Sequence, residues 1–316
     1  MKIISYGELL IDMVSSAPDA AIGQARDWVK APGGAPANVA VGLQRLGAHA
    51  EFWGAVGDDP FGEFLRATVS AEGVSVARLQ TRPERTTIAF VATLASGNKE
   101  ICFYRNPGAD AHFDVAQIGA DAFDKADIFH CGSVSLSLEP SRSAQFELAR
   151  RAREAGALVS FDPNWRPSLW DDFDQARELI WQMMPLSDIV KVADEEWEFV
   201  CGTPDFAEGA SKIREQGPKL VVMTRGAAGA SWNCAAGQGE VAGFKAKAID
   251  TLGAGDSFVA GMLSQIGAAP SLDAALNADS LNDILRFANA CGAIATQQAG
   301  AIPALPSRAE VEAMLA

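Results

Sequence analysis

The chain alternates between amphipathic stretches and short apolar runs. Residues 141–155 place apolar side chains at helical spacing among arginines and end at Gly156, and the run 158–161 that follows has the length of a buried strand. The same order returns at 206–217 and 220–223. Two further apolar runs have strand length: 127–131 and 188–192. Because the runs are apolar throughout rather than alternating, we predict an α/β protein with a mostly parallel sheet covered by helices on both faces.

Two segments depart from this rhythm, at about residues 9–31 and 85–113. Short runs there, such as 87–91 and 100–105, mix apolar and polar positions, and residues 96–98 between them have turn composition. We expect short antiparallel strands that form a small sheet beside the main one, a lid over a cleft. An ordinary edge hairpin explains the same pattern.

Composition narrows the range of partners. The net charge is −14, which argues against nucleic acid or an anionic membrane as a partner, because phosphate contacts need a basic face. The five cysteines are widely spaced and lack a C-x-x-C pair, so a reduced cytoplasmic setting is expected. Glu8 and Asp12 interrupt the first apolar run, which disfavours a signal peptide. We expect one domain over residues 1–316, with both lid segments inserted in it.

The strongest chemical feature is the stretch D-T-L-G-A-G-D at 250–256, which leads into an apolar run. Small residues at Gly253, Ala254 and Gly255 let consecutive N–H groups converge where a helix begins, and such a turn binds anions. The carboxylate of Asp256 either caps the helix or acts as a general base beside the anion site. Capping alone would not require three small residues before it, so the functional interpretation is favoured.

A second glycine-rich stretch precedes another predicted helix. Gly33 and Gly34 allow a ligand to approach the backbone closely, and Asn38 can both donate and accept hydrogen bonds. A plain loop with Asn38 as the helix cap is the alternative. Asp12 and Arg105, from the two irregular segments, can reach the same cleft, although a lone charge in an edge strand is usually solvated.

Polar residues follow the predicted strands. Carboxyl ends of parallel strands meet at one edge of a sheet, where ligands bind. The stretches 162–166 and 224–229 occupy such positions, although each also has the composition of a simple turn. The sequence lacks a P-loop, a G-x-G-x-x-G unit between strand and helix, the protein-kinase signatures and G-x-S-x-G. A dinucleotide oxidoreductase is therefore disfavoured.

Together these motifs resemble the PfkB (ribokinase-like) family of carbohydrate kinases. The family signature D-T-x-G-A-G-D matches residues 250–256 at each fixed position, and the likeness covers nearly the whole chain. Three stretches are most similar to bacterial fructokinases: 33–38, 103–110 and 287–303. The resemblance implies a three-layer ribokinase-like fold with a β-sheet lid. It also implies transfer of the γ-phosphoryl group of ATP to a primary hydroxyl of a ketose, most simply fructose.

The resemblance also assigns roles to residues. Asp256 would take the proton of the sugar hydroxyl, and the amides of Gly253, Ala254 and Gly255 would hold the charge on the phosphoryl group. The positions implied for sugar binding are Asp12, Gly33, Gly34, Asn38, Arg105, Asn164 and Arg166. The positions implied for ATP are Lys191, Thr224, Arg225, Gly226, Gly229, Gly253, Gly255 and Asn289.

Metal positions follow from the same resemblance. Glu196 matches the end of the family's N-x-x-E motif, which is linked to Mg²⁺ through water, although Ala193 stands where the motif has Asn. Lys191 nearby would then contact a phosphate. Asp250 and the carbonyl of Leu252 match positions that hold a monovalent cation, such as K⁺, in some members.

Three questions stay open at this level. A 2-keto-3-deoxygluconate kinase shares the Asp-x-Asn-x-Arg pattern, and Arg105 and Arg166 would clamp the carboxylate of that sugar. A non-catalytic sugar-binding protein would keep the fold but would have no need for Asp256 beside an anion site. A second copy can pair with the lid edges to give a homodimer.

The segment 277–283 is expected to break a C-terminal helix.

Overall fold

A nine-stranded sheet forms the centre of the molecule, with the order β13-β12-β11-β10-β9-β8-β1-β4-β5 among the residues described. The computed structural model describes residues 1–316 except 18, 95–98 and 107. The strands are β1 (Lys2–Tyr6), β4 (His49–Gly57), β5 (Leu79–Arg82), β8 (Ile128–Gly132), β9 (Leu158–Asp162), β10 (Ile189–Ala193), β11 (Leu220–Thr224), β12 (Ala230–Cys234) and β13 (Gly237–Val241).

The sheet is parallel from β5 to β11. β1 pairs in parallel with β4 and β8, and β10 pairs in parallel with β9 and β11. At one edge of the described sheet, the pairs β11–β12 and β12–β13 are antiparallel, so β12 runs opposite to its neighbours. The four strands predicted from apolar runs are β8, β9, β10 and β11, so the predicted fold class is confirmed. Their carboxyl ends therefore lie along one edge of the sheet.

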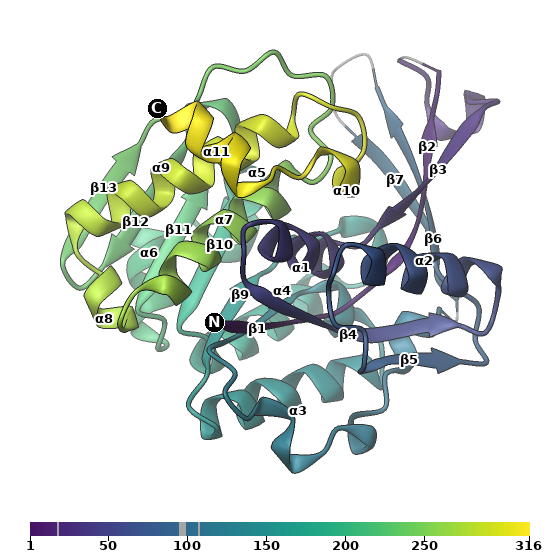
Figure 1. The fold of residues 1–316 in the computed structure, drawn as a ribbon, viewed down its shortest axis with the longest axis horizontal. Coiled ribbons are helices and arrows are strands. Elements are labelled where there is room, and N and C mark those ends of the chain that lie inside the picture. The colour runs from purple at the N-terminus through teal and green to yellow at the C-terminus, as the bar shows by residue number, and fades with distance from the viewer. Residues whose placement is uncertain (18, 95–98, 107) are drawn as a thin grey trace.

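Helices cover both faces of the sheet (Figure 1). They are α1 (Ala35–Arg45), α2 (Pro60–Ala71), α3 (Ser141–Glu154), α4 (Phe173–Met183), α5 (Asp194–Cys201), α6 (Phe206–Glu215), α7 (Ala254–Ala268), α8 (Leu272–Ala275), α9 (Ala278–Ala295), α10 (Ala301–Ala304) and α11 (Arg308–Leu315). One hydrophobic core joins the sheet to α1, α2, α7 and α9, and a second joins it to α3, α4, α5 and α6.

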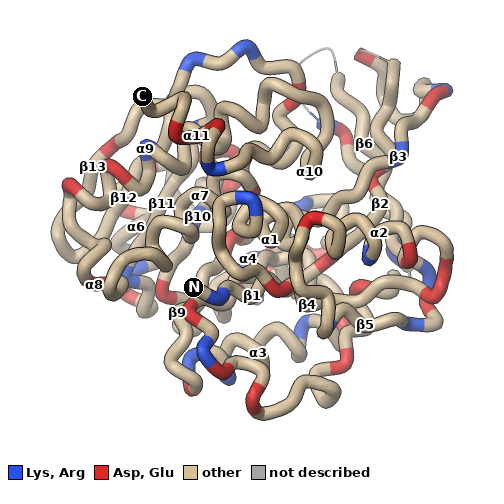
Figure 2. Tube along the Cα trace, in the orientation of Figure 1, with Lys and Arg blue, Asp and Glu red and all other residues tan. Residues whose placement is uncertain are grey.

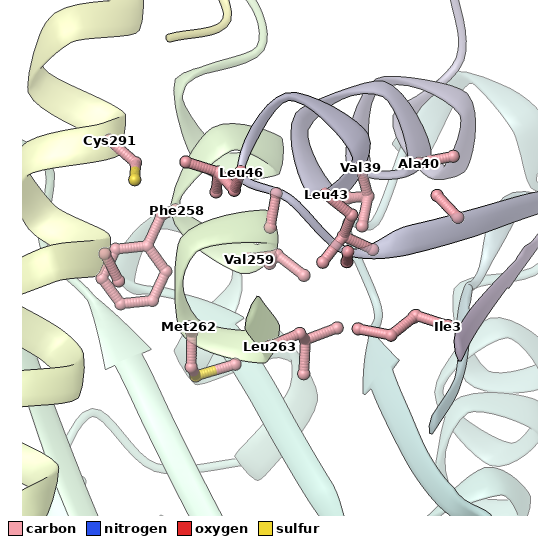
Figure 3. Close-up of a cluster of buried hydrophobic side chains, with 14 of the residues drawn as sticks. Ile3, Val39, Ala40, Leu43, Leu46, Phe258, Val259, Met262, Leu263 and Cys291 are labelled. Carbon is pink, nitrogen blue, oxygen red and sulfur yellow. The ribbon is translucent and has the colours of Figure 1, made fainter. Parts of the chain in front are cut away.

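Helix α7 is buried along most of its length, and this packing fixes the position of its first turn. Figure 3 shows Leu263 of α7 beside Ile3 of β1, below Leu43 of α1. Phe258 points the other way, toward the helix that carries Cys291. A helix that is apolar on nearly every side is held by packing all around it. Its N-terminus is therefore fixed relative to the sheet.

A second, small sheet lies beside the main one, with the order β3-β2-β6-β7 (Figure 1). Its strands are β2 (Leu10–Ser15), β3 (Trp28–Gly33), β6 (Ile88–Thr93) and β7 (Lys99–Tyr104). The predicted small sheet is thus present. Its outer pairs are antiparallel as expected, but β2 and β6 pair in parallel, because each comes from a different one of the two segments. The turn predicted at 96–98 lies outside the described residues.

The segment 277–283 begins a helix instead of breaking one. Asn277 is the cap of α9, and its side-chain oxygen accepts a hydrogen bond of 3.0 Å from the amide of Ser280. The prediction of a break was wrong, because the polar residues after the short α8 are the capping signal of a new helix.

Charged residues lie mainly on the loops and outer helices (Figure 2). No helix among the described residues is long and apolar enough to cross a bilayer. Several charges buried at the carboxyl edge of the sheet depart from this distribution, and some of them lie close to the start of α7.

Candidate active site

The turn before α7 has the shape that an anion site needs. Gly253 is its N-cap, with a left-handed φ of +78°, and a Cβ there would lie 2.9 Å from that of Ala301. Glycine is thus required by both the conformation and the close packing. Helix α7 then starts at Ala254, so the amides that follow point out of the helix N-terminus. A Cβ on Gly255 would lie 3.6 Å from Nζ of Lys191, so an ammonium lies beside this turn.

Asp256 is buried in the first turn of α7. Its Oδ2 accepts a hydrogen bond of 2.8 Å from Nδ2 of Asn38. The N-cap of α7 is Gly253, so Asp256 is not the capping residue. Burial raises the pKa of Asp256 to about 6, against the opposing effect of Asn38. A carboxylate with a pKa near neutrality can accept a proton from an alcohol as charge develops on it. The capping alternative does not describe this geometry.

Asn38 lies within α1 and is not its cap. The N-cap is Gly34, with a φ of +108°, and the amide of Asn38 donates to the carbonyl of Gly34. Oδ1 of Asn38 is buried and has no hydrogen-bond partner among the described residues. A Cβ at Gly33 would overlap the carboxylate of Asp12, so this glycine lets β2 and β3 bring that carboxylate close. This glycine-rich stretch therefore joins the small sheet to α1.

Asp12 of β2 is buried, and Arg166 lies near both it and Asp256. Burial raises the pKa of Asp12 to about 7, and the charges of Lys99 and Arg166 oppose this rise. Arg166 also opposes the rise in the pKa of Asp256. The guanidinium of Arg166 donates to the carbonyls of Asn164 and Trp165, which hold it at the strand end.

Arg105, directly after β7, is almost fully buried. Its Nε donates to Asp110 at 2.7 Å and its Nη1 to Ser137 at 2.7 Å. Its Nη2 has no hydrogen-bond partner among the described residues. A buried guanidinium with one free nitrogen is a ready donor to a bound hydroxyl or anion. Because Arg105 is buried, the alternative that it is a solvated charge on an edge strand is excluded.

A small cavity of about 10 Å³, roughly the space of one water molecule, lies beside Asp256. It is lined by Glu8, Ala35, Pro36, His130, Gly132, Ser133, Val134, Asp162, Asn164 and Asp256. Glu8 accepts a hydrogen bond of 3.0 Å from the amide of Ala35, and burial raises the pKa of Glu8 to about 7. Burial lowers the pKa of His130 to about 4, so its ring is neutral at pH 7. Neither belongs to the predicted set, although His130 lies within the predicted strand 127–131.

A buried ion pair connects the neighbouring strands β9 and β10. Nζ of Lys191 donates to Oδ2 of Asp162 at 3.1 Å, while Oδ1 of Asp162 has no partner among the described residues. Burial opposes the charge of Lys191, but Asp162 and Glu196 outweigh it and raise the pKa of the ammonium. Asp162 is absent from the predicted set because it resembles a turn residue.

The carboxylate of Glu196 accepts hydrogen bonds from two backbone amides, those of Ala193 at 3.0 Å and Trp165 at 2.6 Å. The described residues hold no cluster of three His, Cys, Asp or Glu suited to a metal ion. Mg²⁺ usually keeps several waters and binds one or two carboxylates together with substrate phosphates. Glu196 therefore fits a contact through water with Mg²⁺ that arrives on ATP.

The residues predicted to bind ATP lie in two groups. Lys191, Gly253 and Gly255 lie around the start of α7. The others lie around the loop after β11 and the end of β13: Thr224, Arg225, Gly226, Gly229 and Asn289. Gly229 has a φ of +100°, and a Cβ there would overlap the carbonyl of Val241. Asn289 of α9 donates from Nδ2 to the carbonyls of Val241 and Ala242, each at 3.2 Å. Arg225 is different, because its guanidinium pairs with Glu240 at 3.1 Å on β13. The remaining positions, Thr224 and Gly226, lie on the same loop.

Asp250 is bound by three nitrogen donors. Its carboxylate accepts from the amide of Leu252 at 3.0 Å, the amide of Gly300 at 2.9 Å and Nζ of Lys99 at 2.8 Å. Lys99 comes from the small sheet and belongs to no motif, so the sequence offered no signal for it.

An anion-binding helix start, a buried carboxylate beside it and a polar cavity next to a small sheet are the parts of a kinase that phosphorylates a small alcohol. The comparisons agree with that class. The chain belongs to the pfkB family of carbohydrate kinases, whose family model matches residues 1–308.

Several of the similar proteins are fructokinases. Fructokinase-2 of Solanum habrochaites is 41% identical over 317 residues, which are 99% of this chain and 95% of that protein. Fructokinase of Xylella fastidiosa with bound ATP superimposes with a TM-score of 0.89 at 34% identity, over 99% of this chain and 98% of that one. Fructokinase of Vibrio cholerae O395, with fructose, ADP and calcium, has a TM-score of 0.89 at 36% identity, over 100% and 99%. A double mutant of the Vibrio enzyme contains fructose, ADP and potassium.

Proposed function

We propose that this chain is an ATP-dependent fructokinase, which transfers the γ-phosphoryl group of ATP to a primary hydroxyl of fructose, the one on C6, to give fructose 6-phosphate. The observation that carries the proposal is the carboxylate of Asp256, held by Asn38 beside the turn 253–255, in a chain whose full-length relatives are fructokinases. Such a carboxylate beside an anion site suits the transfer of a phosphoryl group to an alcohol.

In the proposed mechanism, Asp256 accepts the proton of the sugar hydroxyl as the oxygen attacks phosphorus. Asn38 keeps the carboxylate aimed at that hydroxyl through its bond to Oδ2. The amides of Gly253, Ala254 and Gly255 hold the negative charge that develops on the transferred group. Mg²⁺ bound with ATP would neutralise phosphate charge, with Glu196 acting on it through water.

The sugar would lie between the small sheet and the strand ends. The proposed contacts to its hydroxyls are Asp12, Gly33, Gly34, Asn38, Arg105, Asn164 and Arg166. Burial supports this choice, because Asp12, Asn38 and Arg105 are each at most 7% exposed. Hydroxyl groups of a sugar can pair with all these donors and acceptors.

ATP would bind along the edge from β10 to β13. The proposed contacts are Lys191, Thr224, Arg225, Gly226, Gly229, Gly253, Gly255 and Asn289. Lys191 is a buried cation beside the helix start, which supports a phosphate contact. Its carboxylate partner Asp162 keeps it charged and in place. The bond between Arg225 and Glu240 must open if the guanidinium is to reach a phosphate.

A 2-keto-3-deoxygluconate kinase is the second candidate. The unpartnered Nη2 of Arg105 and the position of Arg166 favour it, since two guanidinium groups can bind the carboxylate of that sugar. The cavity itself carries the carboxylates of Glu8, Asp162 and Asp256, which repel an anionic sugar. A neutral ketose therefore fits better.

We also propose a cytoplasmic location, no nucleic-acid or membrane partner and a homodimer formed through the lid. All five cysteines are unpaired, which suits a reducing compartment. The net charge of −14 disfavours polyanionic partners. β3 and β7 are the edge strands of the small sheet, and such edges can pair with a second copy.

A coupled assay of ADP release, with ATP, Mg²⁺ and a panel of sugars, tests the proposed function. We expect the highest kcat/KM with fructose and much lower values with 2-keto-3-deoxygluconate, ribose and glucose. A clear preference for 2-keto-3-deoxygluconate would reverse the choice between the two candidates. Sugar binding by calorimetry without ADP release from any sugar would instead identify a non-catalytic sugar-binding protein.

A further inference from the structure

A lysine of the small sheet reaches the loop that precedes α7. Lys99 is the first residue of β7, and its Nζ lies 2.8 Å from Oδ1 of Asp250. The side chains are 18% and 17% exposed, so both are largely shielded from water. The two residues are 151 positions apart in the chain. This ion pair therefore connects the lid directly to the stretch 250–256.

The carboxylate of Asp250 organises the anion-binding turn. It accepts the amide of Leu252, one residue before Gly253, and the amide of Gly300, next to the Ala301 on which Gly253 packs. Its geometry thus sets the direction of the amides at 253–255. The negative charge of Asp250 would weaken phosphate binding, because an unpaired anion this close repels a phosphate at those amides.

Lys99 offsets this electrostatic repulsion. Its ammonium neutralises Asp250 and also acts on the buried Asp12, which lies on β2 of the same small sheet. β7 packs beside the turn Pro167–Leu169, which follows Arg166. The lysine can therefore reach Asp250 only while the small sheet lies against the strand ends.

We propose that Lys99 is a positioning residue for phosphoryl transfer, whose ammonium binds the Asp250 carboxylate when the lid is closed and so supplies, from the chain itself, the positive charge that the anion-binding turn requires. This inference rests on the proposed function. A K⁺ ion on Oδ1 of Asp250 does not fit the present arrangement, because the ammonium already occupies that side of the carboxylate. The lysine thus contacts Asp250, one of the positions that hold a monovalent cation in some members of the family.

Lys99→Met, Lys99→Arg and the matched control Lys30→Met test the proposal. Lys30 lies on β3 of the same sheet, but its ammonium is 3.5 Å from the centroid of the Phe64 ring instead of a carboxylate. We expect Lys99→Met to lower kcat about tenfold, less than the ~10²–10³ lost with an anion-hole donor, because it acts through those donors. Lys99→Arg keeps the charge and most of the activity, and Lys30→Met behaves as the wild type.

Chemical rescue separates the role of the charge from that of packing. K⁺ should raise kcat of Lys99→Met above the value in tetramethylammonium at equal ionic strength, and should leave the wild type nearly unchanged. A wild type that depends on K⁺ as strongly as Lys99→Met would overturn the proposal. So would a Lys99→Met variant with the kinetics of Lys30→Met.

Hydrogen exchange gives a readout that needs no turnover. In the substrate-free protein, the amides of residues 250–256 should exchange faster in Lys99→Met than in the wild type or Lys30→Met. Unchanged exchange there would contradict the positioning role. Because this measurement holds even if the wild type phosphorylates no sugar, failure of the proposed function and failure of this inference remain distinguishable.

Discussion

At the scale of single residues, the buried carboxylates of the site share a raised pKa and differ in their positions and partners. Glu8, Asp12 and Asp256 are each at most 9% exposed, and burial raises the pKa of all three. They differ in their partners, because Asp256 takes the side-chain amide of Asn38 and Glu8 takes a backbone amide. Only Asp256 stands in the first turn of a helix whose N-terminus lies open to an anion. The proposed base is thus distinguished by its position and not by its pKa alone.

Asp256→Asn tests that position. The amide keeps the size of the side chain and can still accept from Asn38, so we expect normal folding and sugar binding. It cannot take a proton, so kcat should fall at least about a hundredfold, within the ~10²–10⁴ that a positioned base contributes. Steady-state kinetics with fructose measures the loss.

The matched control for this substitution is Asp279→Asn. Asp279 also lies in the first turn of a helix, α9, but is exposed. It should keep wild-type kinetics. Turnover by Asp256→Asn at the rate of this control would refute the assignment of the base.

At the scale of elements, several of the functional groups lie where a strand ends or a helix begins. Asp162 ends β9, Thr224 ends β11, and Asp256 opens α7. The parallel register brings the strand ends to one edge, and the two cores fix the helices against it. The small sheet contacts the rest of the molecule through the bond from Lys99 to Asp250 and through the packing of β7 beside Pro167–Leu169, of β3 beside α10 and of β2 beside α2.

The small sheet should therefore respond to sugar as a unit. We expect saturating fructose to slow hydrogen exchange in β6 and β7, because a bound ligand holds the sheet against the strand ends. The hairpin β12–β13 lies at an edge of the main sheet and serves as the internal control. Equal exchange in β6 and β7 with and without fructose would count against a lid.

At the scale of the whole molecule, buried ionisable groups connect the site to stability. A carboxylate with a raised pKa contributes stability that is present below its unfolded pKa and is lost as the pH rises through its folded pKa. A histidine with a lowered pKa has the opposite effect, since its stability is lost as the pH falls. Glu8 and His130 therefore partly cancel in the wild type, and single variants are needed to separate them.

Glu8→Gln isolates one of these effects. The neutral amide can still accept from Ala35, but it avoids the charge that Glu8 must carry as the pH rises past about 7. Relative to the wild type, its free energy of unfolding should rise by about 1–3 kcal/mol between pH 5 and pH 8. Chemical denaturation at both pH values measures the change.

For Glu154→Gln, an exposed site on α3, the difference from the wild type should stay the same at both pH values. If Glu8→Gln follows this control, Glu8 is not buried as the structure has it.

Sequence pattern predicted most of the architecture. Strands β8 to β11, the helices between them and the small sheet follow from apolar runs and their spacing, because periodicity records which faces are buried. The parallel pairing of β2 with β6 and the start of α9 at Ala278 did not follow, since one depends on distant segments and the other on a cap mistaken for a break. That residues 1–316 form one domain stays a prediction.

What the sequence alone determined is the turn 250–256 and its helix, because the small residues and the carboxylate that an anion site needs are neighbours in the chain. Tertiary structure alone decided which distant charges surround that turn. Lys99, Glu8 and Asp162 look like ordinary strand or turn residues, and only the folded chain buries them beside Asp250, Asp256 and Lys191. Electrostatic interactions depend on distance through space and on exclusion of water, and neither quantity is written along the chain.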